Sequence, residues 1–175
     1  ARYEAFAEYL NLQGISVVVP DQRGFGKSII AGQYGHFSDK DGWSKLLDDH
    51  DALWQQLPSD LTTTPKIILG HSMGSYIAQH VIQRHLEAKG LVISGSGRSP
   101  RALLHFARAF AGLEKIRQGK RGYSKALDKL SFGSFNNAFK PNRTAFDWLS
   151  RDSAQVDRYV NDPLCGGLCT NQFWL

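Results

Sequence analysis

The feature that most constrains this chain of 175 residues is a glycine-flanked serine directly after a short apolar run. Residues 67–69 are Ile-Ile-Leu, Gly70 to Gly74 read Gly-His-Ser-Met-Gly, and a helical pattern follows. In a strand–turn–helix setting, this Gly-x-Ser-x-Gly spacing places the serine at the tip of a sharp, strained turn, with its hydroxyl above the sheet edge. We therefore predict that Ser72 is a nucleophile; the alternative is an ordinary strand-to-helix turn.

The neighbours of Ser72 have roles of their own in this prediction. We expect the backbone N–H of Met73, at the start of the helix, to point to the place where an oxyanion would form. We also expect side chains at Gly70 and Gly74 to collide with the neighbouring strand and helix, which would explain a glycine at both positions. These four residues are the candidate site.

Strands and helices alternate through the first part of the chain. The expected helices cover residues 2–13, 41–57 and 76–86, and the expected strands cover residues 15–19, 66–69 and 90–94. Short, dense apolar runs are typical of buried parallel strands. Alternation with helices predicts parallel crossover connections. The predicted fold class is therefore α/β, with a partial doubly wound parallel core of about three strands over residues 1–97.

Residues 98–175 follow a different pattern, without a convincing strand. Short amphipathic helices are expected near residues 101–110, 123–132, 144–149 and 153–160. We expect Ser99 and Pro100 to start the first of them, as cap and first-turn residue. We interpret this region as a helical cap over the sheet edge. Six apolar side chains would then cover Ser72: Leu103, Leu104, Phe106, Phe110, Phe132 and Phe135.

Positive charge is concentrated at the start of this second region. The whole chain has a net charge of +5, but residues 98–129 contain nine basic and two acidic residues, a net of +7. Such a surface favours anionic lipid or phosphate; a solvated helix face is the alternative. Peripheral association with an anionic membrane surface is therefore one of two interpretations of this charge. Nucleic acid is not an expected partner because no nucleic-acid motif accompanies the charge.

Motifs for a cofactor or a metal fail on their spacing. The Gly26-Lys27-Ser28 run lacks the glycine that a phosphate loop needs at position 21, where Asp21 stands. We expect that loop to be structural, with Asp21 and Arg23 paired locally. Cys165 and Cys169 have no histidine nearby and make no zinc set. We expect no cofactor, no metal, and reduced cysteines in a cytoplasmic protein.

Three motifs resemble one known family. They are Asp21-x-Arg23-Gly24-x-Gly26-x-Ser28, Gly70-His71-Ser72-Met73-Gly74, and the ending formed by residues 143–152 and 162–166. Together they resemble the monoacylglycerol lipase and lysophospholipase branch of the α/β-hydrolases, the serine aminopeptidase-like group. The sequence departs from that pattern at Ser75, where the family usually has glycine, and at Gln22 and Phe25, where histidine is frequent.

The resemblance implies a serine hydrolase that cleaves carboxylic esters of lipids through an acyl-enzyme. Lysophospholipids and monoacylglycerols are the implied substrates. Two alternatives stay open, one being a small-ester esterase or serine peptidase on the same fold. The other is a non-catalytic module that binds lipid or a partner.

A serine nucleophile also needs a base and an orienting acid, in the chain order Ser, acid, His. After Ser72 the histidines are His80, His85 and His105, and the only acid before the last of them is Glu87. None of these satisfies the expected order and placement, and His36, His50 and His71 precede the serine. We therefore expect the acid and base to lie outside this chain, as in an internal fragment that is inactive alone.

Overall fold

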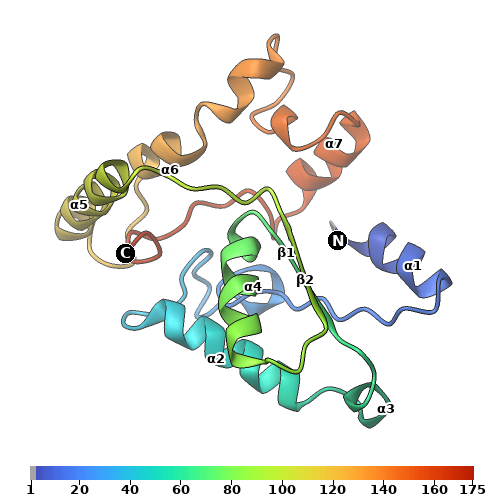
Figure 1. Ribbon diagram of the computed structural model, residues 1–175. Helices are drawn as coiled ribbons and strands as arrows, with labels where there is room; N and C mark the ends of the chain where they lie inside the picture. The colour runs from blue at the N-terminus through green and yellow to red at the C-terminus, as the bar shows by residue number, and fades with distance from the viewer. Residues whose placement is uncertain (1–2) are drawn as a thin grey trace.

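Two paired strands form the centre of the computed structural model, which describes residues 3–175 (Figure 1). Strand β1 (Ile67–His71) pairs in parallel with β2 (Gly90–Ser94), from Ile67 opposite Gly90 to His71 opposite Ser94. Helix α4 (Met73–Arg84) connects them. The predicted strand–helix–strand unit is therefore confirmed, and so is the α/β fold class. Its sheet has two strands in the described part of the chain, not about three.

The helices agree with the predicted order, with some shifted ends. Helix α5 extends eight residues beyond its predicted end at Phe110, and a short helix, α3, forms between the helix predicted to end at residue 57 and the strand predicted to begin at residue 66. Besides α4, the structure has the following helices: α1 (Glu4–Leu12), η1 (Gly26–Ser28), α2 (Gly42–Gln55), α3 (Ser59–Thr62), α5 (Arg101–Gln118), α6 (Lys125–Phe132), η2 (Phe135–Phe139), η3 (Asp147–Leu149) and α7 (Ser153–Asn161).

The main core lies where α2 packs on α4. Leu46 and Leu47 of α2 meet Ile77 and Val81 of α4, and Leu46 is fully buried. Phe37, from the loop before α2, closes the cluster. Figure 1 shows both helices on the same side of the two strands. The apolar stripes of these helices thus bury each other and hold α4 against the sheet.

The predicted strand at residues 15–19 is wrong. This segment is extended but belongs to no sheet, and Ile15, Val18 and Val19 are 51%, 48% and 55% exposed. A strand forms only where a neighbour accepts and donates its backbone hydrogen bonds. Within residues 3–175, the two strands that exist pair with each other. β2 is also less buried than predicted, since Val92 and Ile93 are each 47% exposed.

Helix starts in the second half are set by single side chains. Ser124 caps α6 by accepting from the N–H of Leu127, and Asp152 caps α7 by accepting from the N–H of Ala154. Helix α5 begins at Arg101, as predicted, but the expected cap is wrong: Pro100 takes the N-cap position and Ser99 makes no cap. Pro100 has no side-chain acceptor, so the first N–H groups of α5 lack a side-chain cap.

The last residues return to the first half of the chain. Asn171 is fully buried, and its amide donates to the carbonyls of Glu114 and Gly119 at the end of α5. The N–H of Thr170 donates to the carbonyl of Gly35 at 3.0 Å. Phe173 packs on Phe37 with ring centroids 4.9 Å apart. Residues 170–173 therefore join the end of α5 to the loop before α2.

None of the helices in residues 3–175 combines the length and the apolar character needed to cross a bilayer.

Candidate active site

Ser72 occupies a strained turn between β1 and α4. Its φ of 53° and ψ of −122° lie in a region that non-glycine residues rarely adopt. The residue before it ends β1 and the residue after it begins α4. The sharp strand–turn–helix geometry predicted from Gly-x-Ser-x-Gly is therefore present, and strain of this kind commonly marks a functional position.

Backbone hydrogen bonds hold the turn from both sides. The N–H of Ser72 donates to the carbonyl of Ser94, the last residue of β2, at 2.9 Å. The carbonyl of Ser72 accepts twice from Ser75, from its N–H at 2.9 Å and from its hydroxyl at 2.6 Å. These bonds satisfy both backbone groups of the strained residue, so the turn is tied to the sheet and to the helix.

The Ser72 side chain is exposed at the carboxyl end of the sheet. β1 and β2 end side by side at His71 and Ser94, and Figure 1 shows the turn into α4 at the upper end of the strands. His71 Nδ1 lies 3.2 Å from the hydroxyl of Ser94. Ligands of parallel α/β sheets bind at this end, so the serine stands at the correct edge for chemistry.

The two glycines that flank the serine differ in the space around the position that a Cβ would occupy. A Cβ on Gly70 would lie 2.6 Å from the carbonyl carbon of Gly74 and 2.7 Å from Cβ of Ala78, so the expected collision with the helix is present. A Cβ on Gly74 would meet nothing within 4 Å. The expectation for Gly74 is therefore wrong for this structure, because its own carbonyl, and not its Cα, faces Gly70.

Two of the three histidines that follow Ser72 contact residues other than the serine, and the third lies on α5. His80 lies edge-on to Trp43, with ring centroids 5.6 Å apart. His85 stacks on Trp54 and its Nε2 lies 2.9 Å from a carboxylate oxygen of Asp51. His105 lies on α5. Among the hydrogen bonds of residues 3–175, none joins a histidine ring to the Ser72 hydroxyl. That the acid and base lie outside this chain stays a prediction.

The loop that precedes the first core helix is structural, but its partners differ from those predicted. Arg23 does not pair with Asp21; it forms two hydrogen bonds of 2.6 and 2.5 Å with Asp49 on α2. Asp21 instead accepts from the N–H of Lys27 at 2.9 Å. Gly24 has a φ of 79° and would carry a Cβ 2.6 Å from the carbonyl oxygen of His36. The loop is therefore closed by contacts that are distant in sequence.

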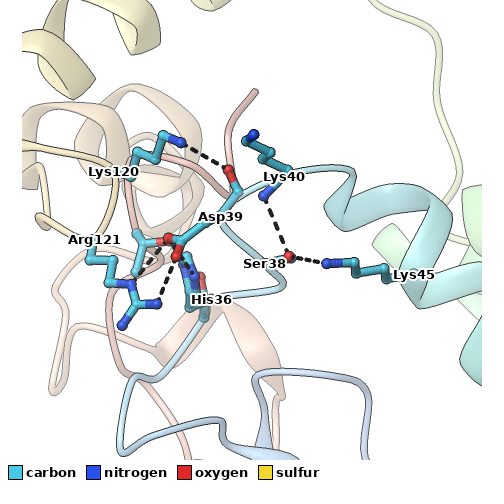
Figure 2. A network of polar contacts seen from close by, with 9 residues as sticks. His36, Ser38, Asp39, Lys40, Lys45, Lys120 and Arg121 are labelled. Carbon is cyan, nitrogen blue, oxygen red and sulfur yellow. Dashed lines mark hydrogen bonds and ion pairs between the residues drawn. The ribbon is translucent and has the colours of Figure 1, made fainter.

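A polar network around Asp39 joins the two halves of the chain (Figure 2). Arg121, just after α5, donates to both oxygens of the Asp39 carboxylate at 3.1 and 2.7 Å. These bonds lower the pKa of Asp39. His36 Nε2 lies 3.4 Å from the same carboxylate and its Nδ1 lies 3.0 Å from the Thr170 hydroxyl.

No motif in the sequence indicates this network. Asp41 holds the N-cap position of α2 without a side-chain bond, and the nearby Asp39 binds Arg121. Burial lowers the pKa of His36. Its side chain is therefore held as a neutral ring between two hydrogen-bonding partners.

Two hollows lie outside the turn at Ser72. An open one of about 850 Å³ lies beside Asp39 and Arg121, lined also by Lys40 and Lys120. A second one of about 430 Å³ lies between α5 and α6, lined by Phe106, Phe110, Ala126, Lys129 and Leu130. Ser72 lines neither. The six apolar side chains expected to cover it include Leu103, Leu104 and Phe106, which are 50–60% exposed.

The cysteines and the acidic residues offer no metal centre. Cys165 and Cys169 form no disulfide, and burial raises the pKa of the Cys169 thiol to about 12. In the part of the chain that the structure describes, no three His, Cys, Asp or Glu side chains come together as metal ligands would.

Comparison with known proteins gives one family for the whole chain. The family described as serine aminopeptidase, S33, matches residues 1–175. A monoacylglycerol lipase of Mycolicibacterium smegmatis is 29% identical over 164 residues, which cover 93% of this chain and 51% of that protein. The chain thus spans about half the length of this curated relative.

Solved structures with the same arrangement are similar over nearly the whole chain. A highly thermostable carboxyl esterase from Bacillus coagulans, in complex with glycerol, has a TM-score of 0.82 and 25% identity. A lipase in its open form has a TM-score of 0.77 and 24% identity. Each match covers 99% of this chain and 57% of the other. These likenesses confirm the α/β-hydrolase fold.

The two flanking glycines make a matched test of the turn. Gly70→Ala is expected to lower the midpoint of thermal unfolding by several degrees, because its Cβ would overlap the backbone of α4. Gly74→Ala, placed in open space within a helix, is expected to leave the midpoint unchanged or raise it. Differential scanning calorimetry of both variants checks this. Equal losses in the two would contradict the steric argument.

The buried ring of His36 predicts a pH dependence of stability. Its pKa is lowered on folding, so the unfolded chain binds more protons below its ordinary value of about 6.5. The free energy of unfolding is therefore expected to fall as the pH drops from about 7 to about 5.5. Urea titrations at the two values measure this fall. In His36→Gln the fall should be smaller, and an unchanged fall would show that His36 is not its source.

Proposed function

Because the chain belongs to the serine aminopeptidase, S33, family, we propose that it carries the nucleophile of a serine hydrolase that cleaves carboxylic esters. The observation that supports this most is the strained turn at Ser72, exposed at the carboxyl end of β1 and β2. Strain is retained where the surrounding structure over-determines it, which the bonds from Ser94 and Ser75 do here.

The proposed reaction proceeds through an acyl-enzyme. The Ser72 oxygen attacks the ester carbonyl carbon, and the carbonyl oxygen becomes an oxyanion that accepts a hydrogen bond from the N–H of Met73. Collapse of this tetrahedral species expels the alcohol and leaves the acyl group on Ser72. Water then attacks the acyl carbon and releases the carboxylic acid. The base that takes the Ser72 proton gives it to the departing alcohol, and in the second step it takes a proton from the attacking water and returns one to Ser72. This base and its orienting acid are proposed to lie outside this chain.

The proposed substrates are lipid esters, either lysophospholipids or monoacylglycerols. The relatives include a monoacylglycerol lipase, a carboxyl esterase and a lipase, which favours esters over peptides. The hollow between α5 and α6, which Ser72 does not line, has Phe106 and Phe110 in its wall and shows that the cap region can offer an apolar surface. A small-ester esterase or peptidase, and a non-catalytic binding module, are the alternatives.

The two parts of the chain are proposed to have different roles. Residues 1–97 would supply the core with the serine, and residues 98–175 would form the cap. Both named strands lie in the first part, and the second contains α5, α6, α7 and short 3-10 helices. The half-exposed apolar side chains on α5 support a surface that meets lipid.

A labelling experiment tests the nucleophile. The full-length protein should react with a fluorophosphonate probe, and Ser72→Ala should abolish labelling and lower ester hydrolysis by at least about a thousandfold. Ser96→Ala, an exposed serine in the loop after β2, is the matched control and should keep both. Labelling that survives Ser72→Ala would overturn the assignment. If the protein cleaves only acetyl esters or peptides in a panel that includes esters of longer acyl chains, the proposal of a lipid substrate is refuted.

A vesicle experiment tests whether the basic start of the cap meets an anionic membrane. The full-length protein is expected to sediment with phosphatidylcholine vesicles that contain phosphatidylglycerol, and less so at high salt. Arg101→Glu with Arg108→Glu should weaken this binding, since both arginines are exposed on α5. Arg151→Glu with Arg158→Glu makes the same charge change elsewhere and should keep it. Equal losses in the two pairs would refute a dedicated surface.

A further inference from the structure

Ser75 is a buried hydroxyl residue whose hydrogen bond ends on the reactive turn. Its side chain lies in the first turn of α4 and is fully buried. Its hydroxyl donates to the carbonyl oxygen of Ser72 at 2.6 Å, and its own N–H donates to the same oxygen at 2.9 Å. A carbonyl oxygen has two lone pairs, so Ser75 alone occupies the full accepting capacity of the Ser72 carbonyl.

Because of the geometry of the peptide bond, this contact also orients the proposed oxyanion donor, the N–H of Met73. The carbonyl of Ser72 and the N–H of Met73 belong to one peptide unit, which is planar and trans. Both bonds lie in that plane and point in opposite directions, so a contact that fixes the carbonyl also fixes the N–H. Rotation of this unit about its two flanking bonds would turn the Met73 N–H away from the face where the proposed oxyanion forms.

The backbone strain at Ser72 favours rotation of the Ser72–Met73 peptide unit unless hydrogen bonds restrain it. Ser72 has a φ of 53°, a strained backbone conformation for a residue other than glycine. A change at ψ, now −122°, would move the peptide unit toward a less strained form. Two hydrogen bonds to the Ser72 carbonyl oppose that change. The one from the hydroxyl is sheltered from water, where a hydrogen bond has no solvent competitor.

We propose that Ser75 is a positioning residue that locks the Ser72–Met73 peptide unit, so that the Met73 N–H faces the oxyanion. The inference rests on the proposed function, because it assumes that Ser72 is acylated. It adds a role for a residue that touches neither substrate nor the reacting atoms. A glycine at this position, usual in the family that the sequence resembles, would leave only the backbone N–H bond. The serine therefore gives this chain a second, side-chain lock.

Kinetics of the full-length protein test the lock. Ser75→Ala keeps the N–H bond and removes the hydroxyl, and its kcat for an ester should fall about threefold to tenfold with KM unchanged. The inhibition constant of a trifluoromethyl ketone, which forms a tetrahedral oxyanion on the serine, should rise by a similar factor. Ser75→Cys fills the same space with a weaker donor and should also lose kcat. Full activity in Ser75→Cys would show that packing, not the hydrogen bond, matters.

A control variant separates the lock from general loss of stability. Ser124 is likewise buried, at 2% exposure, and its hydroxyl accepts from the N–H of Leu127 in the cap of α6. Ser124→Ala should lower the unfolding midpoint as Ser75→Ala does, but leave kcat and the ketone inhibition constant unchanged. Equal kinetic losses in both variants would overturn the inference.

Failure of the positioning role and failure of the proposed function, on which it rests, would give different results. Without Ser72-dependent labelling of the unaltered protein by a fluorophosphonate, the proposed function itself fails. With such labelling, unaltered kcat and ketone inhibition in Ser75→Ala would overturn the positioning role alone.

Discussion

The strained backbone at Ser72 is the constraint on which the rest of the arrangement depends. A residue with φ of 53° persists only if its neighbours compensate for it, and here a strand and a helix both do. The N–H of Ser72 is bound to Ser94 at the end of β2, and its carbonyl is bound to Ser75 in α4. β2 and α4 must therefore both be in place before the hydroxyl stands at the sheet edge.

The packing of α4 explains why the turn can be rigid although much of the sheet is exposed. Ile77 and Val81 of α4 bury themselves against α2, and Arg23 ties the preceding loop to Asp49 on the same helix. The second half of the chain reaches this core through Asp39, which binds Arg121. The proposed cap is thus joined to the core by this ion pair and by Phe173, which packs on Phe37, while Leu103, Leu104 and Phe106 of α5 stay half exposed.

Local patterns predicted much of the fold and the centre of the site. β2 has the residues expected for it, and the turn at Ser72 follows from the spacing of two glycines. Two of the predictions that are wrong concern contacts between segments distant in the chain. Residues 15–19 have the composition of a strand but no neighbouring strand to pair with. Arg23 binds Asp49 on α2 instead of the nearby Asp21. The periodicity of a sequence indicates which face of a segment can be buried and whether the segment can form a strand. Whether the strand forms depends on a neighbouring strand that is distant in the chain.

The sequence by itself determined the α/β class, the strand–turn–helix at Ser72 and the family, because each depends on residues close together in the chain. Only the tertiary structure decided which glycine is required by its surroundings, and which side chain holds the turn. Gly70 faces the carbonyl of Gly74 and the methyl of Ala78, and Ser75 turns its hydroxyl inward to the carbonyl of Ser72. The physical reason is that steric contact and hydrogen bonding are properties of distances in space, which spacing along the chain does not fix.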